Sequence, residues 1–300
     1  MYFRIEPPPV FFLHIPKTGG TAIGSWLQSV YRVRDYLDVD IPQVAACSAE
    51  RLSRYRCYHS WHHGRNMLEF IGRPDLAVFT VLREPIERTV SQFDQHKRWL
   101  AKHPQKFRPE YLEQMQPLLV GDISNCTDIS RISPTQTALL GNRRDYRTFF
   151  ENLRRSGSRE QLQQPFGISQ IPTPSPFDDA CAWLRSMPVV GLAERFAESM
   201  QLIADLLCIP PPEELPVANV NPRRSHRENK YRDALPQDTL ARLEEHNRHD
   251  FELYALAQEL FEQQWARFNA RPRRTYSIAP RLRAQTRRAR AFAHTRLRRS

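Results

Sequence analysis

The residues with the clearest chemical potential lie at positions 17–21, which read Lys-Thr-Gly-Gly-Thr. Glycines lack a Cβ, so they let a ligand approach the backbone closely, and the amides that start a helix attract anions. Lys17 adds a full positive charge to those amides. This composition predicts a site for an anion such as a phosphate group. The order differs from the Walker sequence GxxxxGK[ST], in which the lysine follows the glycines. Taken alone, the segment could also be an ordinary tight turn between a strand and a helix.

Arg83 and Ser91 form a second candidate pair, eight positions apart. A guanidinium group presents a fixed fork of donors to phosphate oxygens, and a serine hydroxyl adds a neutral donor. The alternative is a helix whose charged residues, Glu84, Glu87 and Arg88 among them, form a solvated face.

Both groups need elements that position them. The apolar run from Val10 predicts a buried strand, and residues 22–31 have the apolar spacing of a helix, with Thr21 as its cap. Residues 76–82 predict a second strand, and Pro85 suits the first turn of the next helix. In a parallel sheet both loops would follow carboxyl ends of strands. We therefore expect the two anion-binding segments to converge at one edge of the sheet.

Two longer strings carry a family resemblance. HIPKTGGT, at residues 14–21, resembles the 5′-phosphosulfate loop of sulfotransferases that use 3′-phosphoadenylyl sulfate (PAPS), in particular the carbohydrate enzymes of the heparan sulfate 2-O/6-O type. LREPIERTVSQF, at residues 82–93, looks like the 3′-phosphate motif of the same family. Weaker likeness extends over about residues 10–265. The resemblance implies an α/β fold of three layers, P-loop-like, with a mostly parallel central sheet.

The resemblance also implies roles for individual residues. Lys17 would neutralise charge on the departing 5′-phosphate, and Thr18, Gly19, Gly20 and Thr21 would hold that phosphate. Arg83 and Ser91 would hold the 3′-phosphate. Arg223 and Arg224 are the nearest match to a basic loop that closes over the phosphates in relatives, with exposed loop cations as the alternative. Fixed cations stabilise the leaving group, so no metal is expected.

Histidines supply the candidate base. Residues 54–60 predict a strand that ends in a turn holding His59, His62 and His63. Zinc binding is one interpretation, but the spacing lacks the helical His-Glu-x-x-His pattern and no cysteine or carboxylate cluster is close. In the resembled family, a histidine after the first helix takes the proton of the acceptor. His59 is the preferred counterpart, with His62 and His63 as competitors, because an imidazole titrates near neutral pH. His14 is interpreted as a packed strand residue.

The remaining chain predicts one catalytic domain and a tail. Residues 1–268 are expected to form the sulfotransferase domain, with a variable insertion or lid at about 142–176 and a single closing helix over 236–268. Relatives often carry Gln-Thr-Arg in the helix over 133–141, whereas this chain has Ala138 in the third place. The departure puts in doubt a cofactor or substrate contact from that helix.

Charge is concentrated at the end of the chain. The formal net charge is +11, and the arginine-rich tail at 269–300 accounts for the excess. The near-neutral body does not suggest a nucleic-acid-binding protein. The tail is expected to be either a disordered, solvated extension or a segment that contacts an anionic membrane or polyanion. The five cysteines form no CxxC pair, and no signal peptide or membrane anchor is recognisable. We expect a cytoplasmic location, or a peripheral one at the membrane.

Two other functions fit parts of the pattern. A nucleotide-dependent kinase would use a similar cradle with ATP and Mg²⁺, but a strand-end aspartate would be expected where Arg83 and Glu84 stand. A non-catalytic polyanion- or membrane-binding protein would depend on the arginine tail. For a sulfotransferase, the acceptor would be a hydroxyl-bearing molecule, most simply a glycan or glycolipid by family likeness.

Overall fold

A parallel sheet forms the centre of the molecule. The structure, a computed structural model, describes residues 6–61, 64–73, 75–107, 109–156, 168–215 and 231–272. Within these ranges a five-stranded sheet has the order β2-β3-β1-β4-β7, and each neighbouring pair is parallel. Its strands are β1 (Val10–His14), β2 (Tyr36–Val39), β3 (Cys57–Trp61), β4 (Ala77–Leu82) and β7 (Val189–Leu192). A small antiparallel pair joins β5 (Arg143–Arg144) to β6 (Gln170–Ile171).

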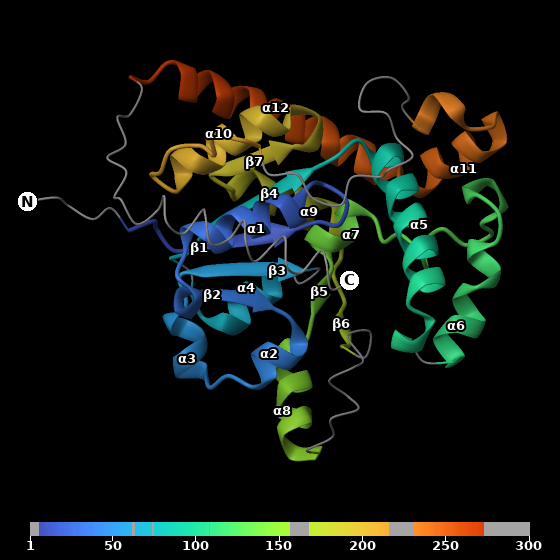
Figure 1. Cartoon of the computed structure of the whole chain (residues 1–300), viewed down its shortest axis with the longest axis horizontal. Helices are drawn as coiled ribbons and strands as arrows, with labels where there is room; N and C mark the ends of the chain where they lie inside the picture. Colours follow the sequence, from blue (N-terminus) through green and yellow to red (C-terminus); the bar gives the residue numbers. More distant parts are fainter. Residues whose placement is uncertain are drawn as a thin grey trace, which may run out of the picture.

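Helices flank the sheet, as Figure 1 shows. They are α1 (Gly20–Val30), α2 (Ile41–Ala45), α3 (Ala49–Arg54), α4 (Arg65–Ile71), α5 (Pro85–Lys102), α6 (Pro109–Met115), α7 (Gln136–Gly141), α8 (Tyr146–Ser156), α9 (Pro176–Ser186), α10 (Phe196–Leu206), α11 (Gln237–His246) and α12 (Arg248–Asn269). Helices α10 and α12 pack on β7. In Figure 1, α5, α6 and α11 gather beyond the end of the sheet toward which the strand arrows point. The predicted α/β class with a mostly parallel sheet is confirmed.

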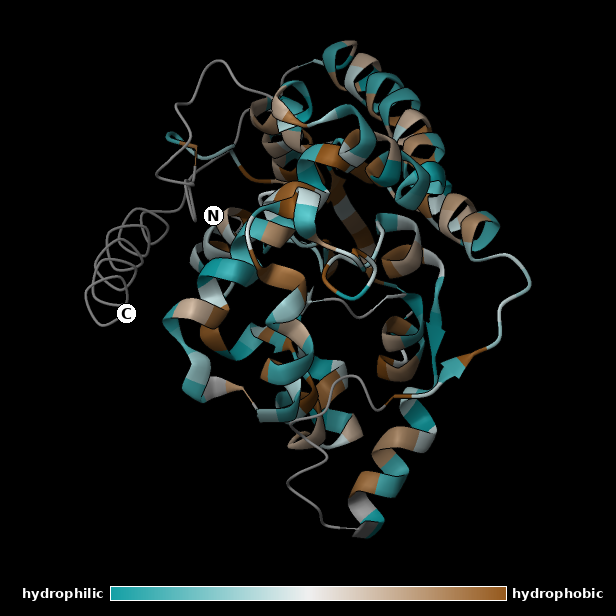
Figure 2. Cartoon of the chain, turned by 90° about the vertical axis from the view of Figure 1, so that its right-hand side faces the viewer, coloured by the Kyte–Doolittle hydropathy of each residue, from teal (hydrophilic) through white to brown (hydrophobic). Residues whose placement is uncertain are grey.

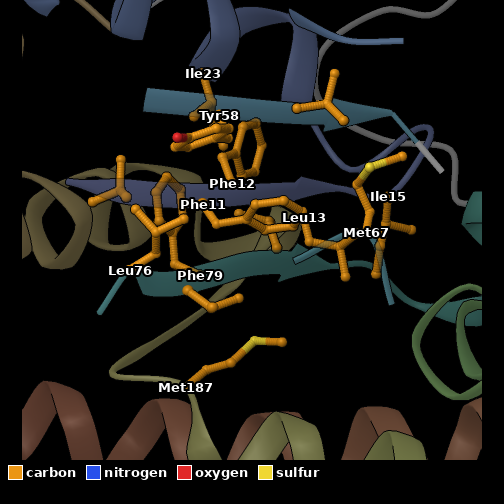
Figure 3. Close-up of a cluster of buried hydrophobic side chains, with 14 of the residues drawn as sticks. Phe11, Phe12, Leu13, Ile15, Ile23, Tyr58, Met67, Leu76, Phe79 and Met187 are labelled. Carbon is orange, nitrogen blue, oxygen red and sulfur yellow. The ribbon is translucent and has the colours of Figure 1, made fainter. Parts of the chain in front are cut away.

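The core explains why β1 lies at the centre. All five residues of β1 are buried, which requires cover on both faces of the sheet because successive side chains point to opposite sides. Figure 3 shows Phe11, Phe12 and Leu13 of β1 clustered with Phe79 of β4 and with Ile23 of α1. Figure 2 shows brown, apolar strands inside and mixed teal and brown ribbons in the outer helices. The segment after β1, which contains Lys17, thus follows directly from a fully buried central strand.

A second apolar cluster fixes helix α5 on its outer side. Ile86, Val90 and Phe93 of α5 are buried there against residues of α6 and α11. Because α5 begins directly after β4, it is held both by the sheet and by this helical lobe. The segment between β4 and α5, which contains Arg83, is therefore tied to the sheet edge.

Several predicted boundaries are wrong. Gly19, with φ 87°, is the N-cap of α1, so the helix starts before Thr21 and Thr21 is not the cap. The single helix predicted over 236–268 is two helices, α11 and α12, separated at Asn247, whose side chain accepts a hydrogen bond from Thr89 of α5. The described part of the predicted insertion at 142–176 contains β5, α8 and β6. No helix within the described residues has the length and apolarity needed to cross a membrane.

Candidate active site

The loop between β1 and α1 has the backbone shape of an anion cradle. Lys17 has φ 70° and Gly19 has φ 87°, so two residues of this short loop adopt the left-handed conformation. For a lysine this conformation is uncommon, and such residues concentrate at functional sites. The Thr18 hydroxyl donates to the Ile15 carbonyl at 2.8 Å and closes the loop from inside. Within the described chain no side chain caps the N-terminus of α1, where the first amides and the helix dipole favour an anion.

The two predicted anion-binding segments meet. Nη1 of Arg83 donates to the backbone carbonyl of Lys17 at 3.1 Å, although 66 residues separate them in sequence. Strands β1 and β4 are parallel neighbours, so their carboxyl ends bring the two loops to the same edge. Nη2 of Arg83 also lies 3.5 Å from the Glu87 carboxylate, one turn along α5. The guanidinium group is therefore held over the cradle and is mostly buried.

Positive charge accumulates around the side chain of Lys17. Burial, followed by the charges of Arg83 and Arg98, lowers the pKa of Lys17 to about 8, while Asp94 opposes this effect. A cluster of cations in a partly desolvated position is unfavourable without an anion. Bringing a phosphate or sulfate group to this position would relieve the repulsion, which is the electrostatic signature of an anion site.

One face of helix α5 runs past both cations. Glu87 lies beside Arg83, and Asp94 and Arg98 act on Lys17. Ser91 is half-buried and stands four residues after Glu87 and three before Asp94, so it shares their helical face. The structure therefore brings Ser91 to the same side of α5 as the two cations. Glu87 and Arg88 are buried, unlike residues of a solvated charged face.

A buried clamp fixes the backbone of Arg83. The Gln136 amide accepts from the Arg83 amide at 3.0 Å and donates to the Arg83 carbonyl at 2.8 Å. Asp250 of α12 in turn accepts from the backbone amides of Gln136 and Thr137 at 2.7 and 2.8 Å, which caps helix α7. The helix with the Ala138 departure thus contributes to the site through Gln136, a function that sequence reasoning missed.

His59 lies in a buried polar cluster. It is the third residue of β3, and β2 lies between the first helix and that strand, so it does not end the strand after the first helix as expected. His59 is 2% exposed. Its Nε2 is 2.9 Å from Nδ1 of His14, and its Nδ1 is 2.7 Å from the Tyr36 hydroxyl and 3.1 Å from the Asp38 carboxylate.

The pairing register places this cluster on one face of the sheet. Phe12 pairs with His59, His59 pairs with Asp38, and His14 pairs with Trp61, so these side chains share a face because strand residues alternate. The rings of His14 and His59 stack with centroids 5.1 Å apart, and the Trp61 ring lies 3.9 Å from that of His14. Sequence reasoning missed Tyr36 and Asp38 and interpreted His14 as a packing residue.

Two glycines of α1 make room for the imidazoles. A Cβ on Gly20 would lie 1.9 Å from Cδ2 of His14, and a Cβ on Gly24 would lie 2.5 Å from Cε1 of His59. The two glycines are one helical turn apart, so this face of α1 lies directly on both rings. The predicted helix over 22–31 contained Gly24 but not Gly20, so the spacing of the two glycines on one helical face became apparent only with the start of α1 at Gly20.

Some predicted site residues cannot be placed. His62, His63, Arg223 and Arg224 lie outside the described residues, as do positions 273–300 of the tail. The short helix η8 (Tyr231–Ala234) follows the basic loop. In it, the Tyr231 hydroxyl donates to Asp94 at 3.0 Å, so the described chain resumes next to the cations. Among the described residues no group of three or more histidine, cysteine or carboxylate side chains is arranged to hold a metal ion.

The parallel sheet defines an α/β protein, and the uncapped, glycine-started helix with two convergent cations at the carboxyl edge of the sheet is an arrangement suited to an anion. Comparison with protein-family models identifies the family to which this α/β protein belongs. The chain belongs to the sulfotransferase family, whose model, described as Sulfotransferase family, matches residues 2–257. It is therefore a transferase of sulfuryl groups. A comparison with curated proteins finds no significant match.

Proposed function

We propose that this protein transfers the sulfuryl group of PAPS to a hydroxyl of a carbohydrate or glycolipid acceptor. The observation that carries the proposal is the contact between Arg83 and the Lys17 carbonyl, because a doubly phosphorylated adenosine needs one cationic site for each phosphate. The donor set fits such a ligand: an ammonium, a guanidinium and the N-terminus of α1 surround a loop in which Gly19 and Gly20 leave the backbone open.

In this proposal the cradle binds the 5′-phosphosulfate. Lys17 and the amides of residues 18–21 hold the 5′-phosphate, and Lys17 neutralises the negative charge that develops on the bridging oxygen. Arg83 and Ser91 hold the 3′-phosphate, which brings the adenosine across the edge between β1 and β4. Arg223 and Arg224 are proposed to approach the phosphates from the basic loop, and η8 anchors the end of that loop beside α5.

The chemical step is an in-line displacement at sulfur. The acceptor oxygen forms the new S–O bond, the bond from sulfur to the bridging oxygen breaks, and adenosine 3′,5′-bisphosphate leaves. His59 is proposed to take up the proton that the acceptor hydroxyl loses, and Asp38 stabilises the resulting imidazolium. Burial opposes ionisation of Asp38, but hydrogen bonds from His59 and Tyr36 and the charge of His59 outweigh it and lower the pKa of the carboxyl. No metal is assigned a role in this step.

Calorimetric titration tests the proposed donor. Adenosine 3′,5′-bisphosphate should bind with 1:1 stoichiometry in the presence of a chelator, and ATP with Mg²⁺ should bind far more weakly. Tight binding of ATP–Mg²⁺ without binding of the bisphosphate would instead support a kinase. If the full chain binds neither nucleotide but binds a polyanion, and deletion of residues 271–300 abolishes that binding, the results would support a polyanion-binding protein. A screen of glycans and glycolipids with ³⁵S-labelled PAPS would then identify the acceptor.

A further inference from the structure

Arg88 of α5 has the largest of the fully buried side chains within the described residues. Its Nη2 donates to the Ser133 hydroxyl at 3.1 Å and to the Pro134 carbonyl at 2.7 Å. Its Nε and Nη1 have no hydrogen-bond partner in the described part of the chain. A buried charge with open donors is costly, so packing alone does not explain why an arginine occupies this position.

Asp250 of α12 supplies a buried charge of the opposite sign, and it is 0% exposed. Burial lowers the pKa of Arg88, and the charge of Asp250 opposes this effect. The oxygens of Asp250 accept from the amides of Gln136 and Thr137 at 2.7 and 2.8 Å, and from the Thr137 hydroxyl at 2.7 Å. The hydrogen bonds of Arg88 go to other residues, so the two groups act on each other through their charges.

Residues 133–137 connect the two buried groups. The guanidinium group binds the first two residues of this segment, and the carboxylate binds the last two. Between them, Thr135 is the N-cap of α7. Gln136, the first residue of that helix, holds the Arg83 backbone through two hydrogen bonds of 3.0 and 2.8 Å. A displacement of the segment would therefore be passed on to Arg83.

A neighbouring contact joins the helices that carry the two charged groups. The hydroxyl of Thr89, which follows Arg88 on α5, donates to the Asn247 side chain at 3.0 Å. Asn247 is the N-cap of α12 and stands three residues before Asp250. The start of α7 is thus held by two helices that are themselves tied together. The position of Gln136 is therefore set by packed elements rather than by the loop that precedes it.

We propose that Arg88 and Asp250 are positioning residues for the 3′-phosphate of the donor. They hold the start of α7, and Gln136 in turn keeps the Arg83 backbone where its guanidinium group meets the phosphate. Neither Arg88 nor Asp250 contacts the ligand, because both are fully buried. The inference rests on the proposed function and deepens it, since it explains how the site for one phosphate is fixed by residues that do not touch the ligand.

Asp250→Asn tests the inference because positioning and direct charge effects have opposite signs. Removing a negative charge from the surroundings of Arg83 should, by charge alone, strengthen phosphate binding. Asparagine also replaces one acceptor oxygen by an NH₂ group, so an amide of α7 loses its partner. The inference predicts that adenosine 3′,5′-bisphosphate binds about tenfold more weakly in calorimetry, whereas adenosine 5′-monophosphate keeps its affinity. Equal or tighter binding of the bisphosphate would overturn the inference.

An Arg83→Ala background shows whether the effect passes through Arg83. In that background Asp250→Asn should weaken the bisphosphate by less than about twofold more, because the guanidinium group that it positions is absent. A group that only stabilises the fold would instead lower the melting temperature and weaken both adenosine ligands in parallel, in either background. A full loss of bisphosphate affinity in the Arg83→Ala background, as large as in the wild-type background, would contradict the inference.

Arg88→Met tests the other member of the pair. Methionine removes the charge and the hydrogen bonds to Ser133 and Pro134, and it leaves Asp250 without its compensating charge. We expect a similar selective loss of bisphosphate affinity, with partial recovery in Arg88→Lys, which retains the charge. The double variant Arg88→Met/Asp250→Asn should lose less affinity than the two single losses combined, because no uncompensated charge remains. Strictly additive losses would show that the two groups do not act as a pair.

Arg248→Met, at an exposed arginine of α12, is the matched control and should bind both ligands like the wild-type protein. If Arg88→Met does not fold, Ser133→Ala, which removes one partner of Nη2, takes its place and should show a smaller loss of the same kind. If the wild-type protein binds the bisphosphate no better than the 5′-monophosphate, the proposed function itself fails. If it distinguishes them, and Asp250→Asn and Arg88→Met leave that preference unchanged, only this inference fails.

Discussion

The candidate site has two parts: a cation side, formed by Lys17, Arg83 and Arg98, and a histidine side, formed by His59 and its partners. The charges of the two sides are balanced in different ways. Around Lys17, Arg83 and Arg98 add positive charge, and the pKa of the lysine is lowered to about 8 by burial and by these neighbours. Around His59, by contrast, Asp38, Tyr36 and His14 engage both ring nitrogens. On the cation side, a bound anion would offset the repulsion among the positive charges. On the histidine side, both ring nitrogens of His59 already have hydrogen-bonding partners. The two sides should therefore respond differently to the same kinds of change.

The largest expected effects come from removing the central group of each side. Lys17→Ala and His59→Ala should each lower turnover by about 10²-fold or more, since one removes charge stabilisation of the leaving group and the other removes the proton acceptor. Measuring the affinity of each variant for adenosine 3′,5′-bisphosphate separates the two roles. Lys17→Ala should also weaken adenosine 3′,5′-bisphosphate, whereas His59→Ala should leave its affinity nearly unchanged. Full activity in the His59 variant would move proton acceptance to another group.

Gln136→Leu should have the next largest effect, and on the cation side alone. The substitution removes both hydrogen bonds that hold the Arg83 backbone and leaves two partly buried polar groups without these partners, at a cost of about 1 kcal/mol each. We expect a lower melting temperature and about tenfold weaker binding of the bisphosphate, through misplacement of Arg83. An unchanged affinity would remove Gln136 from the site.

Gly20→Ala and Gly24→Ala test the histidine side by crowding. The added methyl groups would meet the rings of His14 and His59 at 1.9 and 2.5 Å, so side chains or the helix must shift. Overpacking of this kind costs about 1–3 kcal/mol of unfolding free energy, measured by denaturant titration. Ser25→Ala on the exposed face of α1 is the control and should change stability by less than about 0.5 kcal/mol. Stable alanine variants would contradict the close contact of α1 with the rings.

The smallest expected effect is the uptake of a proton by Lys17 when adenosine 3′,5′-bisphosphate binds. Because the pKa of free Lys17 is lowered to about 8, a bound phosphate raises it again by favouring the ammonium. The affinity is therefore fully present below pH 8 and declines as the pH rises above it. Calorimetry at about pH 8.5 in two buffers of different ionisation enthalpy should show uptake of part of a proton, which Lys17→Met abolishes. Equal uptake in that variant would assign the proton to another group.

The sequence predicted the cation side well because its signals are local. A buried strand, a glycine turn and a helix follow one another directly around Lys17, and the parallel sheet then brings Arg83 to the same edge. The Gln136 clamp was not predictable, since it binds the backbone of Arg83 from 53 residues away and leaves no pattern in either segment. The break at Asn247 depends in the same way on a distant contact, with Thr89.

The histidine side was only partly predictable, because it depends on register. His59 was recognised as a candidate, but its hydrogen-bonding partners come from two other strands, β1 and β2, and a shift of one residue in either pairing would send a side chain to the opposite face. Strand β2 has four residues and alternating burial, too short and too polar to assign beforehand. His14 was expected to be packed, and it is 2% exposed, but its hydrogen bond to His59 required the fold.

The central claim is that Lys17 and Arg83 bind opposite ends of one adenosine bisphosphate. Calorimetry with adenosine 5′-monophosphate, adenosine 3′-monophosphate and the 3′,5′-bisphosphate tests it directly in Lys17→Ala and Arg83→Ala. We predict that Arg83→Ala weakens the ligands with a 3′-phosphate and spares the 5′-monophosphate, and that Lys17→Ala shows the reverse pattern. If both variants weaken both monophosphates equally, or neither, the two cations do not divide the ligand between them and the assignment is wrong.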